Sequence, residues 1–504
     1  MNHWIIAPVI LPAMLAPFIV LAMRHDLSLQ RVFSMAGTVA LTLISLGLLY
    51  TASTNPPEVY YLGNWPAPFG IVLVLDKLSA MMVALTAILA VMVQLYAIST
   101  GWDARGKHFH ALFQFQLMGI CGAFLTGDAF NLFVFFEVLL IASYGLMIHG
   151  GGAARLRAGV QYVAYNLVGS TLFLFALATI YSVTGTLNMA DLAVKVAQLP
   201  AEDAALIRVG GVLLLLVFAI KGALVPMQFW LPATYSFAPG PVAALFAVMT
   251  KVGAYAVIRV YTLIFPTDTP VTGLMFDEML MPAAIVTLVI GALGTLGSVS
   301  LMRLVAFAGI TSMGTLFIAV AEFTPQAMTA ALYYLLHSTL ALAALFLIAD
   351  LVLDRRGSDD FSKPLPPIAQ HGLLSALFFG AAIAMAGMPP LSGFLGKLLV
   401  MDATRGADMA LIWTLILVTS LITVVGFGRA GSQLFWKSYA TTTGMARPEP
   451  KREPLAFTMV FALMAALVLM TVFAGPVTDW LSGLSAELFA RTPYIDAVLH
   501  SGKE

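Results

Sequence analysis

The sequence predicts an all-α polytopic membrane protein with about 14 transmembrane helices, two inverted five-helix repeats, and broken helices in spans 7 and 12. Hydrophobic residues make up 60% of the 504 residues and charged residues 10%, whereas an ordinary soluble domain is about 25% charged. The hydrophobic runs have the length, about 20 residues, that crosses a bilayer as a helix. They lack the alternating pattern of roughly ten-residue β-barrel strands.

Composition also limits the function. The formal net charge is zero, so nothing in it indicates nucleic-acid binding. The single cysteine, Cys121, excludes an intramolecular disulfide and an iron–sulfur cluster ligated by this chain alone. The N-terminal residues lack the basic stretch of a cleaved signal peptide, so we expect the first hydrophobic run to be a retained helix. We expect no cofactor and no metal.

The hydrophobic runs fall into four groups. Residues 1–110 hold the first three spans, 111–264 the first repeat, 280–429 the second repeat, and 430–504 a basic cytoplasmic loop, the last span and an outer C-terminal tail. The expected spans are 4–22, 31–51, 71–98, 111–126, 130–148, 160–183, 209–230, 240–264, 280–298, 302–321, 327–352, 372–404, 409–429 and 455–475.

Basic residues are distributed unevenly between the loops. If the N-terminus is outside, fifteen of them fall in inner loops and five in outer segments. Cytoplasmic loops are rich in Lys and Arg, so we expect both termini to lie outside the cytoplasm and the basic loop at 430–454 to lie inside it. The inner residues are Arg24, Arg31, Arg105, Lys107, Arg155, Arg157, Arg303, Arg355, Arg356, Lys363, Arg429, Lys437, Arg447, Lys451 and Arg452, and the outer ones are Lys195, Arg208, Arg405, Arg491 and Lys503.

Five titratable side chains lie inside hydrophobic runs. A charge at the centre of a bilayer costs about 2.5 to 3.5 kcal/mol on translocon-based scales, so such residues usually face a protein interior and mark ion or proton paths. We therefore expect this protein to move charge, with protons the first candidate. The five are the acid Glu137 and the bases Lys221, Lys251, His337 and Lys397.

Other charged residues lie nearer to the ends of the runs. Lys77 and Arg259 are close enough to an end for their side chains to snorkel to water, and we expect both to do so. The acids expected near helix ends are Asp76, Asp128, Glu322 and Asp350.

An internal repeat surrounds His337. Residues 165–177 align without gaps to residues 333–345, with eight of thirteen positions identical, and this alignment places His337 at the position of Gly169. The two segments belong to spans 6 and 11. A displacement of five helices reverses the orientation in the membrane, so we expect two five-helix units of inverted topology.

Proline interrupts two of the runs close to a lysine. Pro226 follows Lys221 in span 7, and Pro389 and Pro390 precede Lys397 in span 12. Proline cannot donate to the carbonyl four residues before it, so a backbone group is freed at membrane depth. Broken helices in corresponding halves are typical of a midplane ion site. Simple packing kinks are the alternative interpretation.

Four motifs together resemble a known superfamily. They are Phe133-Val-Phe-Phe-Glu137, Lys221-Gly-Ala-Leu-Val-Pro-Met-Gln-Phe-Trp-Leu-Pro, Met249-Thr-Lys251-Val-Gly-Ala-Tyr and Gly387-Met-Pro-Pro-Leu-Ser-Gly-Phe-Leu-Gly-Lys397. They look like the antiporter-like subunits of respiratory complex I, membrane-bound hydrogenases and Mrp cation/proton antiporters. Within these, the chain is most similar to the D subunits of the Mrp-type Na⁺/H⁺ antiporters, also called Mnh, Sha or Pha. Ala233-Thr234-Tyr235 stand where complex I relatives commonly carry an Asp and a His.

The resemblance implies a role for each buried charge. Glu137 and Lys221 would form an ion pair in the first half-channel, and making or breaking it would change the proton affinity of the lysine. Lys251 and His337 would pass protons between the halves, because imidazole titrates near pH 6.5, although His337 could equally be a hydrogen-bonded interhelical histidine. Lys397 would be the terminal donor or acceptor of the second half-channel.

The resemblance also implies a function and partners. We expect a proton-translocating subunit of a multisubunit antiporter that exchanges Na⁺, or K⁺ or Li⁺, for protons and is driven by the proton-motive force. Its partners would be the A, B, C, E, F and G subunits, with A and B sometimes fused. The alternatives are a proton-pumping subunit of a redox enzyme, either NADH:quinone oxidoreductase or a membrane-bound hydrogenase, and a membrane scaffold whose charges only pin helices together.

Overall fold

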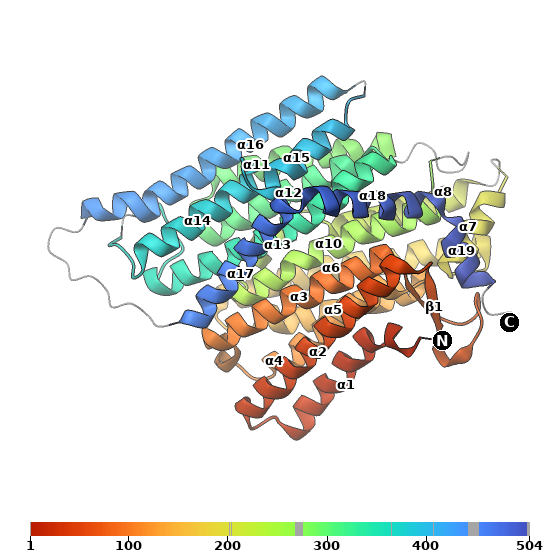
Figure 1. Ribbon diagram of the computed structural model, residues 1–504, viewed down its shortest axis with the longest axis horizontal. Helices are drawn as coiled ribbons and strands as arrows, with labels where there is room; N and C mark the ends of the chain where they lie inside the picture. Colours follow the sequence, from red (N-terminus) through yellow and green to blue (C-terminus); the bar gives the residue numbers. More distant parts are fainter. Residues whose placement is uncertain are drawn as a thin grey trace.

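The computed structural model describes residues 2–200, 202, 204–267, 276–363, 365–406, 408–441 and 453–500. Across these ranges the chain forms a bundle whose long helices run side by side, with one two-stranded hairpin (Figure 1). Four of the basic residues assigned to loops, Arg447, Lys451, Arg452 and Lys503, lie outside the described residues.

The helices follow one another closely along the chain. Strands β1 (Glu58–Tyr61) and β2 (Val72–Leu75) pair antiparallel, with Tyr61 opposite Val72. The helices are α1 (Ala7–Ala22), α2 (Leu27–Thr54), α3 (Lys77–Ser99), α4 (Phe109–Leu125), α5 (Ala129–Met147), α6 (Ala153–Thr184), α7 (Met189–Gln198), α8 (Ala204–Lys221), α9 (Trp230–Phe237), α10 (Gly240–Leu263), α11 (Met281–Gly297), α12 (Leu301–Ala321), α13 (Pro325–Arg356), α14 (His371–Ala386), α15 (Ser392–Ala403), α16 (Met409–Gly431), α17 (Pro454–Val472), α18 (Ala474–Ala490) and α19 (Thr492–Leu499).

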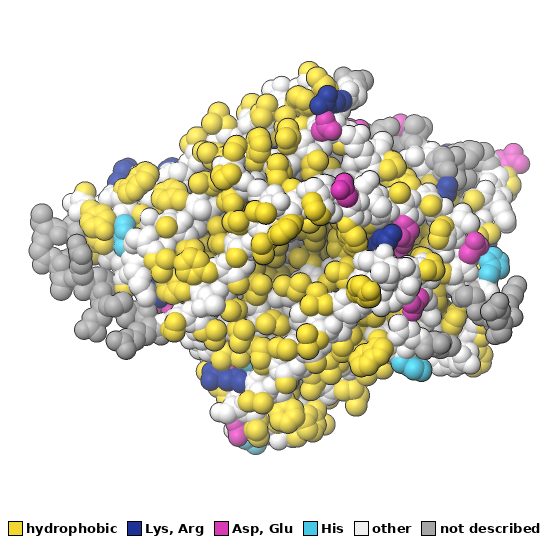
Figure 2. All heavy atoms as spheres, in the orientation of Figure 1, with side chains coloured by type: hydrophobic (Ala, Val, Ile, Leu, Met, Phe, Trp, Pro, Cys, Tyr) yellow, Lys and Arg dark blue, Asp and Glu magenta, His cyan; other side chains and the backbone are white. Residues whose placement is uncertain are grey.

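The architecture confirms an all-helical membrane protein. Eleven of the described helices are long and apolar enough to cross a membrane, and three shorter helices, α1, α4 and α14, are also apolar. The predicted runs overlap these helices. The run 372–404 covers nearly all of α14 and the whole of α15, whereas the run 209–230 covers most of α8 and reaches only the first residue of α9. On the face shown in Figure 2, hydrophobic side chains cover the middle of the bundle and charged side chains lie chiefly toward its ends. Such a surface suits lipid or neighbouring subunits.

Polar residues fix where several helices begin. The Asp76 side chain accepts from the backbone N–H of Ser79 at 2.9 Å, and the Ser79 hydroxyl accepts from the backbone of Asp76, which together form a capping box at the start of α3. Asp128 caps α5 by accepting from the N–H of Asn131 at 2.8 Å. Two of the acids expected near helix ends are therefore caps, which satisfy backbone donors that the helix leaves free.

Three helices, α10, α12 and α13, form the centre of the bundle. All residues of α10 are buried, and α13 packs against α10, α12, α15, α17 and α18. Side chains on α10 and α13 therefore point into protein and not into lipid. This places Lys251, on α10, and His337, on α13, in the interior of the subunit.

Elements of the two predicted repeats correspond at one constant spacing along the chain. Helices α6 and α13 are both 32 residues long, and each is followed by a glycine in the left-handed region, Gly185 and Gly357. The first residues of α4 and α11 are separated along the chain by the same number of residues as those of α6 and α13. Helices α4 and α11 both have 17 residues. Two backbone hydrogen bonds also recur at this spacing. In the first half, the N–H of Ala129 donates to the carbonyl of Leu187 (2.8 Å) and that of Met189 to Gly127 (2.9 Å). In the second half, the N–H of Leu301 donates to the carbonyl of Asp359 and that of Phe361 to Val299 (both 2.9 Å).

The register of this correspondence differs from the sequence alignment by one helical turn. The alignment pairs Tyr165 with Tyr333, whereas the spacing of the helices pairs Tyr165 with His337. Positions four apart lie on the same helix face, so a one-turn shift preserves the pattern of apolar and small residues and misleads an alignment. At the spacing of the helices, Tyr165 and not Gly169 therefore corresponds to His337.

The segment expected as an outer tail folds back as two helices. Helix α18 contacts the N-terminal helices through Lys77 and Glu487 (Nζ–Oε2 3.0 Å) and through a hydrogen bond from Trp480 to Ser53 at 3.1 Å. Tyr61 donates to the carbonyl of Val498 in α19 at 3.1 Å. The C-terminal helices α18 and α19 thus pack against the N-terminal part of the chain, a contact that the sequence did not predict.

The expectation that Arg259 snorkels to water is wrong. Its side chain is buried, and Nη2 lies 2.6 Å from Oδ2 of Asp76, whose side chain is also buried. The partner comes from the start of α3, far away in the sequence, so the charge pattern along one helix could not reveal it. Lys77 is paired with Glu487 and remains partly exposed.

Asp350 lies inside α13 and is almost fully buried. Tyr96 Oη and Trp102 Nε1 each donate to its Oδ2 at 2.9 Å. We predict that Asp350→Ala lowers the stability by about 1–3 kcal/mol for each donor left without an acceptor. Asp350→Asn keeps an acceptor oxygen and should lose much less. Thermal unfolding of the purified variants followed by tryptophan fluorescence checks this, and equal stability of the two variants would contradict it.

Candidate functional site

The first broken helix separates α8 from α9. Helix α8 ends at Lys221, residues 222–229 are not α-helical, and α9 begins at Trp230. The predicted break is therefore present, although the helix ends before Pro226 is reached. Trp230 Nε1 donates to the carbonyl of Ile220 at 2.9 Å, and the N–H of Val225 donates to Thr287 Oγ1 of α11 at 2.8 Å. These bonds satisfy backbone groups that the break frees.

Glu137 and Lys221 both bond to α6 and not to each other. Lys221 Nζ donates to Asn166 Oδ1 at 2.7 Å, and Glu137 accepts a hydrogen bond from Ser170 Oγ. No nitrogen–oxygen distance of 4.0 Å or less joins the two charged groups, so the expected direct ion pair is absent from this structure. Lys221 is buried and within electrostatic range of Glu137, which is half-buried.

The second broken helix has a lysine beside the end of its first half. Helix α14 ends at Ala386, and α15 begins at Ser392. Lys397 Nζ donates to the carbonyl of Ala386 at 2.8 Å and to Ser420 Oγ of α16 at 2.7 Å. The C-terminal carbonyls of a helix carry partial negative charge that favours a cation. Lys221 and Lys397 thus both lie at the C-terminal end of a half-helix, α8 in one case and α14 in the other.

His337 lies against the same break. Its Nδ1 shares a hydrogen bond with Ser392 Oγ at 2.9 Å. Its Nε2 faces the carbonyl of Ala384 without a hydrogen bond of normal geometry. A Cβ at Gly393 would lie 2.8 Å from Nε2 and 1.9 Å from that carbonyl oxygen, so a side chain there would clash. The imidazole therefore has one bonded nitrogen and one nitrogen beside the freed end of α14.

Lys251 is fully buried in the middle of α10. Within the described part of the chain, its Nζ makes one polar contact, with Met313 Sδ at 3.4 Å. An ammonium group has three donors and a thioether is a weak acceptor, so most of its hydrogen-bonding capacity is unused. His337 is within electrostatic range of both Lys251 and Lys397.

The structure therefore brings the five predicted residues into two neighbourhoods. Glu137 and Lys221 meet on α6, whereas Lys251, His337 and Lys397 lie along α10, α13 and α15. Among the described residues, no hydrogen bond joins any two of the five directly. Proton transfer between them would have to use water or side-chain movement.

Gly253 of α10 packs directly on the first break. A Cβ there would lie 2.5 Å from the backbone nitrogen of Gly222 and 2.9 Å from the carbonyl carbon of Lys221. We predict that Gly253→Ala pushes α10 away from Lys221, costs about 1–3 kcal/mol in stability and lowers transport several-fold. Gly428→Ala is the control, because a Cβ at that position meets nothing within 4 Å. Equal transport by the two variants in membrane vesicles would contradict this prediction.

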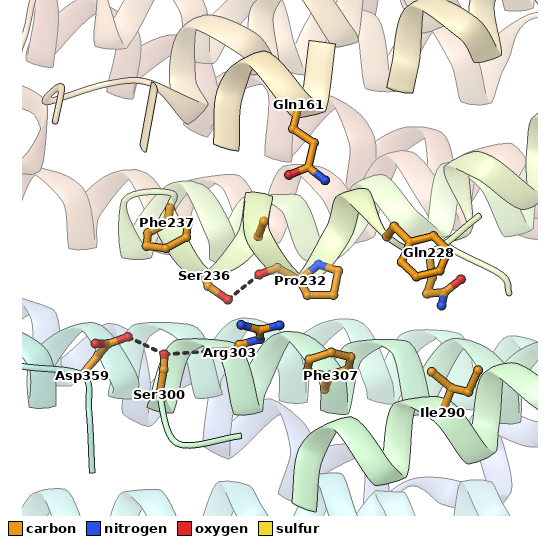
Figure 3. A pocket seen from close by; sticks show the side chains of 12 residues that line it. Gln161, Gln228, Pro232, Ser236, Phe237, Ile290, Ser300, Arg303, Phe307 and Asp359 are labelled. Carbon is orange, nitrogen blue, oxygen red and sulfur yellow. Dashed lines mark hydrogen bonds between the residues drawn. The ribbon is translucent and has the colours of Figure 1, made fainter. Parts of the chain in front are cut away.

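A pocket of about 600 Å³ lies beside the first break (Figure 3). Figure 3 shows Asp359, Ser300 and Ser236 at one end and Gln228 at the other. Gln228 is buried, and its Oε1 has no hydrogen-bond partner among the residues that the structure describes. Ala233 also lines the pocket, and the charged residues of its lining are Arg303 and Asp359. The pocket connects polar groups at the end of the bundle with the break that follows Lys221.

Three polar residues of this site were missed in the sequence. Asn166, Ser170 and Ser420 are ordinary helix residues whose partners lie on other helices. A signal did exist for the first two, because Asn166 and Ser170 are four residues apart on one face of a hydrophobic helix. Among the described residues, no group of three or more His, Cys, Asp or Glu side chains could hold a metal ion.

Known proteins resemble the chain over nearly its whole length. Residues 126–423 match the family described as NADH:quinone oxidoreductase/Mrp antiporter, TM. The D subunit of the Na(+)/H(+) antiporter of Bacillus subtilis (strain 168) is 38% identical over 99% of this chain and 100% of its own length. The D subunit of the probable K(+)/H(+) antiporter of Rhizobium meliloti (strain 1021) is 36% identical over 99% and 98%. A chain of the Mrp complex from Dietzia sp. DQ12-45-1b superimposes with a TM-score of 0.86 at 27% identity, covering 99% of this chain and 100% of that one. The chain therefore belongs to the NADH:quinone oxidoreductase/Mrp antiporter membrane family, within which these relatives are D subunits of antiporters.

Proposed function

We propose that this chain is the proton-translocating subunit of a multisubunit antiporter that exchanges Na⁺ or K⁺ for protons and is driven by the proton-motive force. The observation that carries the proposal is the placement of five titratable groups inside the bundle, with three of them at two broken helices. Buried charges of this kind are costly in a membrane protein and are typical of proton paths. The curated relatives are D subunits of antiporters.

The five groups form a series with distinct tasks. Glu137 controls when Lys221 holds its proton, because a nearby carboxylate stabilises the ammonium form. Lys251 and His337 then pass protons through the buried centre of the bundle, along α10 and α13. Lys397 is the terminal donor or acceptor at the second break. Water fills the gaps between these groups, since no direct hydrogen bond joins any two of them within the described part of the chain.

The topology that supports this path has fourteen crossings. Helices α8 and α9 together form one broken crossing of the membrane, and helices α14 and α15 together form another. Both termini lie outside the cytoplasm of a bacterial inner membrane. The constant spacing that relates α4 to α11 and α6 to α13 supports two repeats. They are inverted if five crossings separate corresponding helices. The chain is divided into the N-terminal helices (1–110), the first repeat (111–264), the second repeat (280–429) and the C-terminal part (430–504).

The partners are the other subunits of an Mrp-type complex, namely the A, B, C, E, F and G subunits, with A and B fused in some cases. The transported cation passes elsewhere in that complex. Hard cations prefer several oxygen ligands, and Glu137 is the one acid that the sequence places at the centre of a predicted membrane span. One carboxylate bonded to Ser170 is a poor cage for Na⁺.

Purification of the tagged chain from native membranes, together with a transport assay, tests this function. We expect the purified complex to contain further antiporter subunits, and everted vesicles to lose their pH gradient when Na⁺ or K⁺ is added. Copurification with flavin or iron–sulfur subunits, together with no response to either cation, would instead identify a subunit of a redox enzyme.

A further inference from the structure

Helix α6 presents two polar side chains to the two charged groups of the first half. Asn166 is buried, and its Nδ2 donates to the carbonyl of Tyr162 at 2.8 Å, so its Oδ1 faces Lys221. One turn further along, Ser170 donates to Glu137, and its Oγ also lies 3.0 Å from the carbonyl oxygen of Asn166. Each charged group therefore has a neutral partner on α6 that keeps it from the other.

We propose that α6 is a switch for proton transfer, in which Asn166 and Ser170 hold Lys221 and Glu137 apart until these two bonds are exchanged for a direct ion pair. This inference rests on the proposed role of Lys221 as a proton carrier. It assigns Asn166 and Ser170 as positioning residues, since they act through the lysine and the glutamate.

The exchange changes how tightly the lysine holds a proton. A carboxylate partner stabilises an ammonium group much more than a neutral amide does. Lys221 bonded to Asn166 therefore releases its proton more readily than Lys221 bonded to Glu137. Side chains four residues apart on a helix are about 5–6 Å apart at Cβ, so rotation of the long Lys221 and Glu137 side chains is enough to bring the charges together.

The surroundings of the pair contain few other titratable groups. Among the described residues these are Tyr144 of α5, which feels the charge of Glu137, and Tyr162 of α6. Helix α10 presents Gly253 and helix α12 presents Phe317 to the break, and neither carries a charge. The balance between the two states is therefore set mainly by the α6 side chains.

The switch is linked to the broken helix through aromatic residues. The Tyr162 ring, one turn before Asn166, stacks on Trp230 with a centroid distance of 5.3 Å. Trp230 in turn donates to the carbonyl of Ile220, next to Lys221. Tyr162 Oη also shares a hydrogen bond with Ser143 of α5 at 2.9 Å. These contacts connect α9 and α5 to the turn of α6 that carries Asn166.

The test compares Asn166→Leu and Ser170→Ala with the control Thr171→Ala in the assembled complex. Thr171 is next to Ser170 but is exposed on the surface of α6. Loss of either neutral partner favours the ion pair, so the pH profile of antiport should move to higher pH, by about one unit for Asn166→Leu and by less for Ser170→Ala. A cryo-EM structure of Asn166→Leu should show Lys221 Nζ in direct contact with the Glu137 carboxylate. The control should have the wild-type profile.

The outcomes separate this inference from the proposed function. An assembled Asn166→Leu complex with an unchanged pH profile, or with Lys221 still away from Glu137, would overturn the switch even if Lys221→Ala is inactive. A lower maximal rate without a change in profile would indicate a purely structural role and would also overturn it. Full antiport activity in Lys221→Ala would instead contradict the proposed function itself.

Discussion

Replacement of Lys221 by alanine is expected to lower antiport by about 100-fold or more, the order of magnitude lost when a positioned proton-transfer group is removed. Lys221 ends α8, is buried, and bonds to Asn166 on the neighbouring helix. Alanine has no proton to carry and leaves the Asn166 oxygen without its donor, which costs about 1–3 kcal/mol in stability. Cation-induced collapse of the pH gradient in everted vesicles measures the effect.

Two comparisons make this result specific. Glu137→Gln keeps the size of the side chain and an acceptor for Ser170 but removes the charge, so we expect it to be nearly as inactive as Lys221→Ala. Lys195→Ala removes a lysine from a surface pair with Asp191, whose two side chains are 41% and 15% exposed, and should leave transport unchanged. Wild-type transport by either buried-site variant, with the complex assembled, would rule out the assigned roles.

Replacement of Arg259 by alanine is expected to destabilise the protein by about 3–5 kcal/mol, because it leaves a buried carboxylate without its cation. Arg259 and Asp76 have side-chain exposures of 4% and 5%, and their charged atoms are 2.6 Å apart. Asp76 also caps α3 through Ser79, so its displacement would free the start of that helix. Chemical or thermal unfolding in detergent should show the loss.

The control for this prediction is a pair on the surface. Lys363 lies 3.8 Å from Asp360, with side-chain exposures of 79% and 31%, and such exposed pairs contribute about 0–1 kcal/mol. Lys363→Ala should therefore be close to wild type. The double variant Arg259→Ala/Asp76→Asn should regain part of the stability, because no charge is then left buried and the asparagine still caps α3. An Arg259→Ala variant as stable as Lys363→Ala would refute the buried-pair interpretation.

Features that depend on neighbouring residues in the sequence could be predicted well. Hydrophobic length located the helices, and the prolines near Lys221 and Lys397 located both breaks, because each is a local property of the chain. The bounds of the first break were less accurate. Helix α8 ends at Lys221, where Trp230 and Thr287 satisfy the freed backbone groups. Those partners come from other turns and another helix, and the proline alone cannot reveal them.

Features that depend on distant partners could not be predicted. The sequence identified Glu137 and Lys221 as charges that need compensation, but it could not show that the compensating groups are neutral residues of α6. For the same reason the sequence suggests that Arg259 reaches water, although Asp76 supplies its partner from the start of a much earlier helix. The small hairpin was missed because the apolar strand β2 lies within the hydrophobic run predicted as the span 71–98. Helices α18 and α19 were missed because acidic residues such as Asp479, Glu487 and Asp496 make this segment unlike a membrane span.

We propose above that the buried series from Glu137 to Lys397 carries the protons. The most direct test of this proposal is proton-coupled cation flux through the purified complex in proteoliposomes, with Glu137→Gln, Lys221→Ala and Lys397→Ala combined in this chain. We predict that an imposed pH gradient drives Na⁺ or K⁺ uptake by the wild-type complex and no uptake above empty liposomes by the triple variant. Uptake by an intact triple-variant complex at the wild-type rate would show that these charges only hold the helices together.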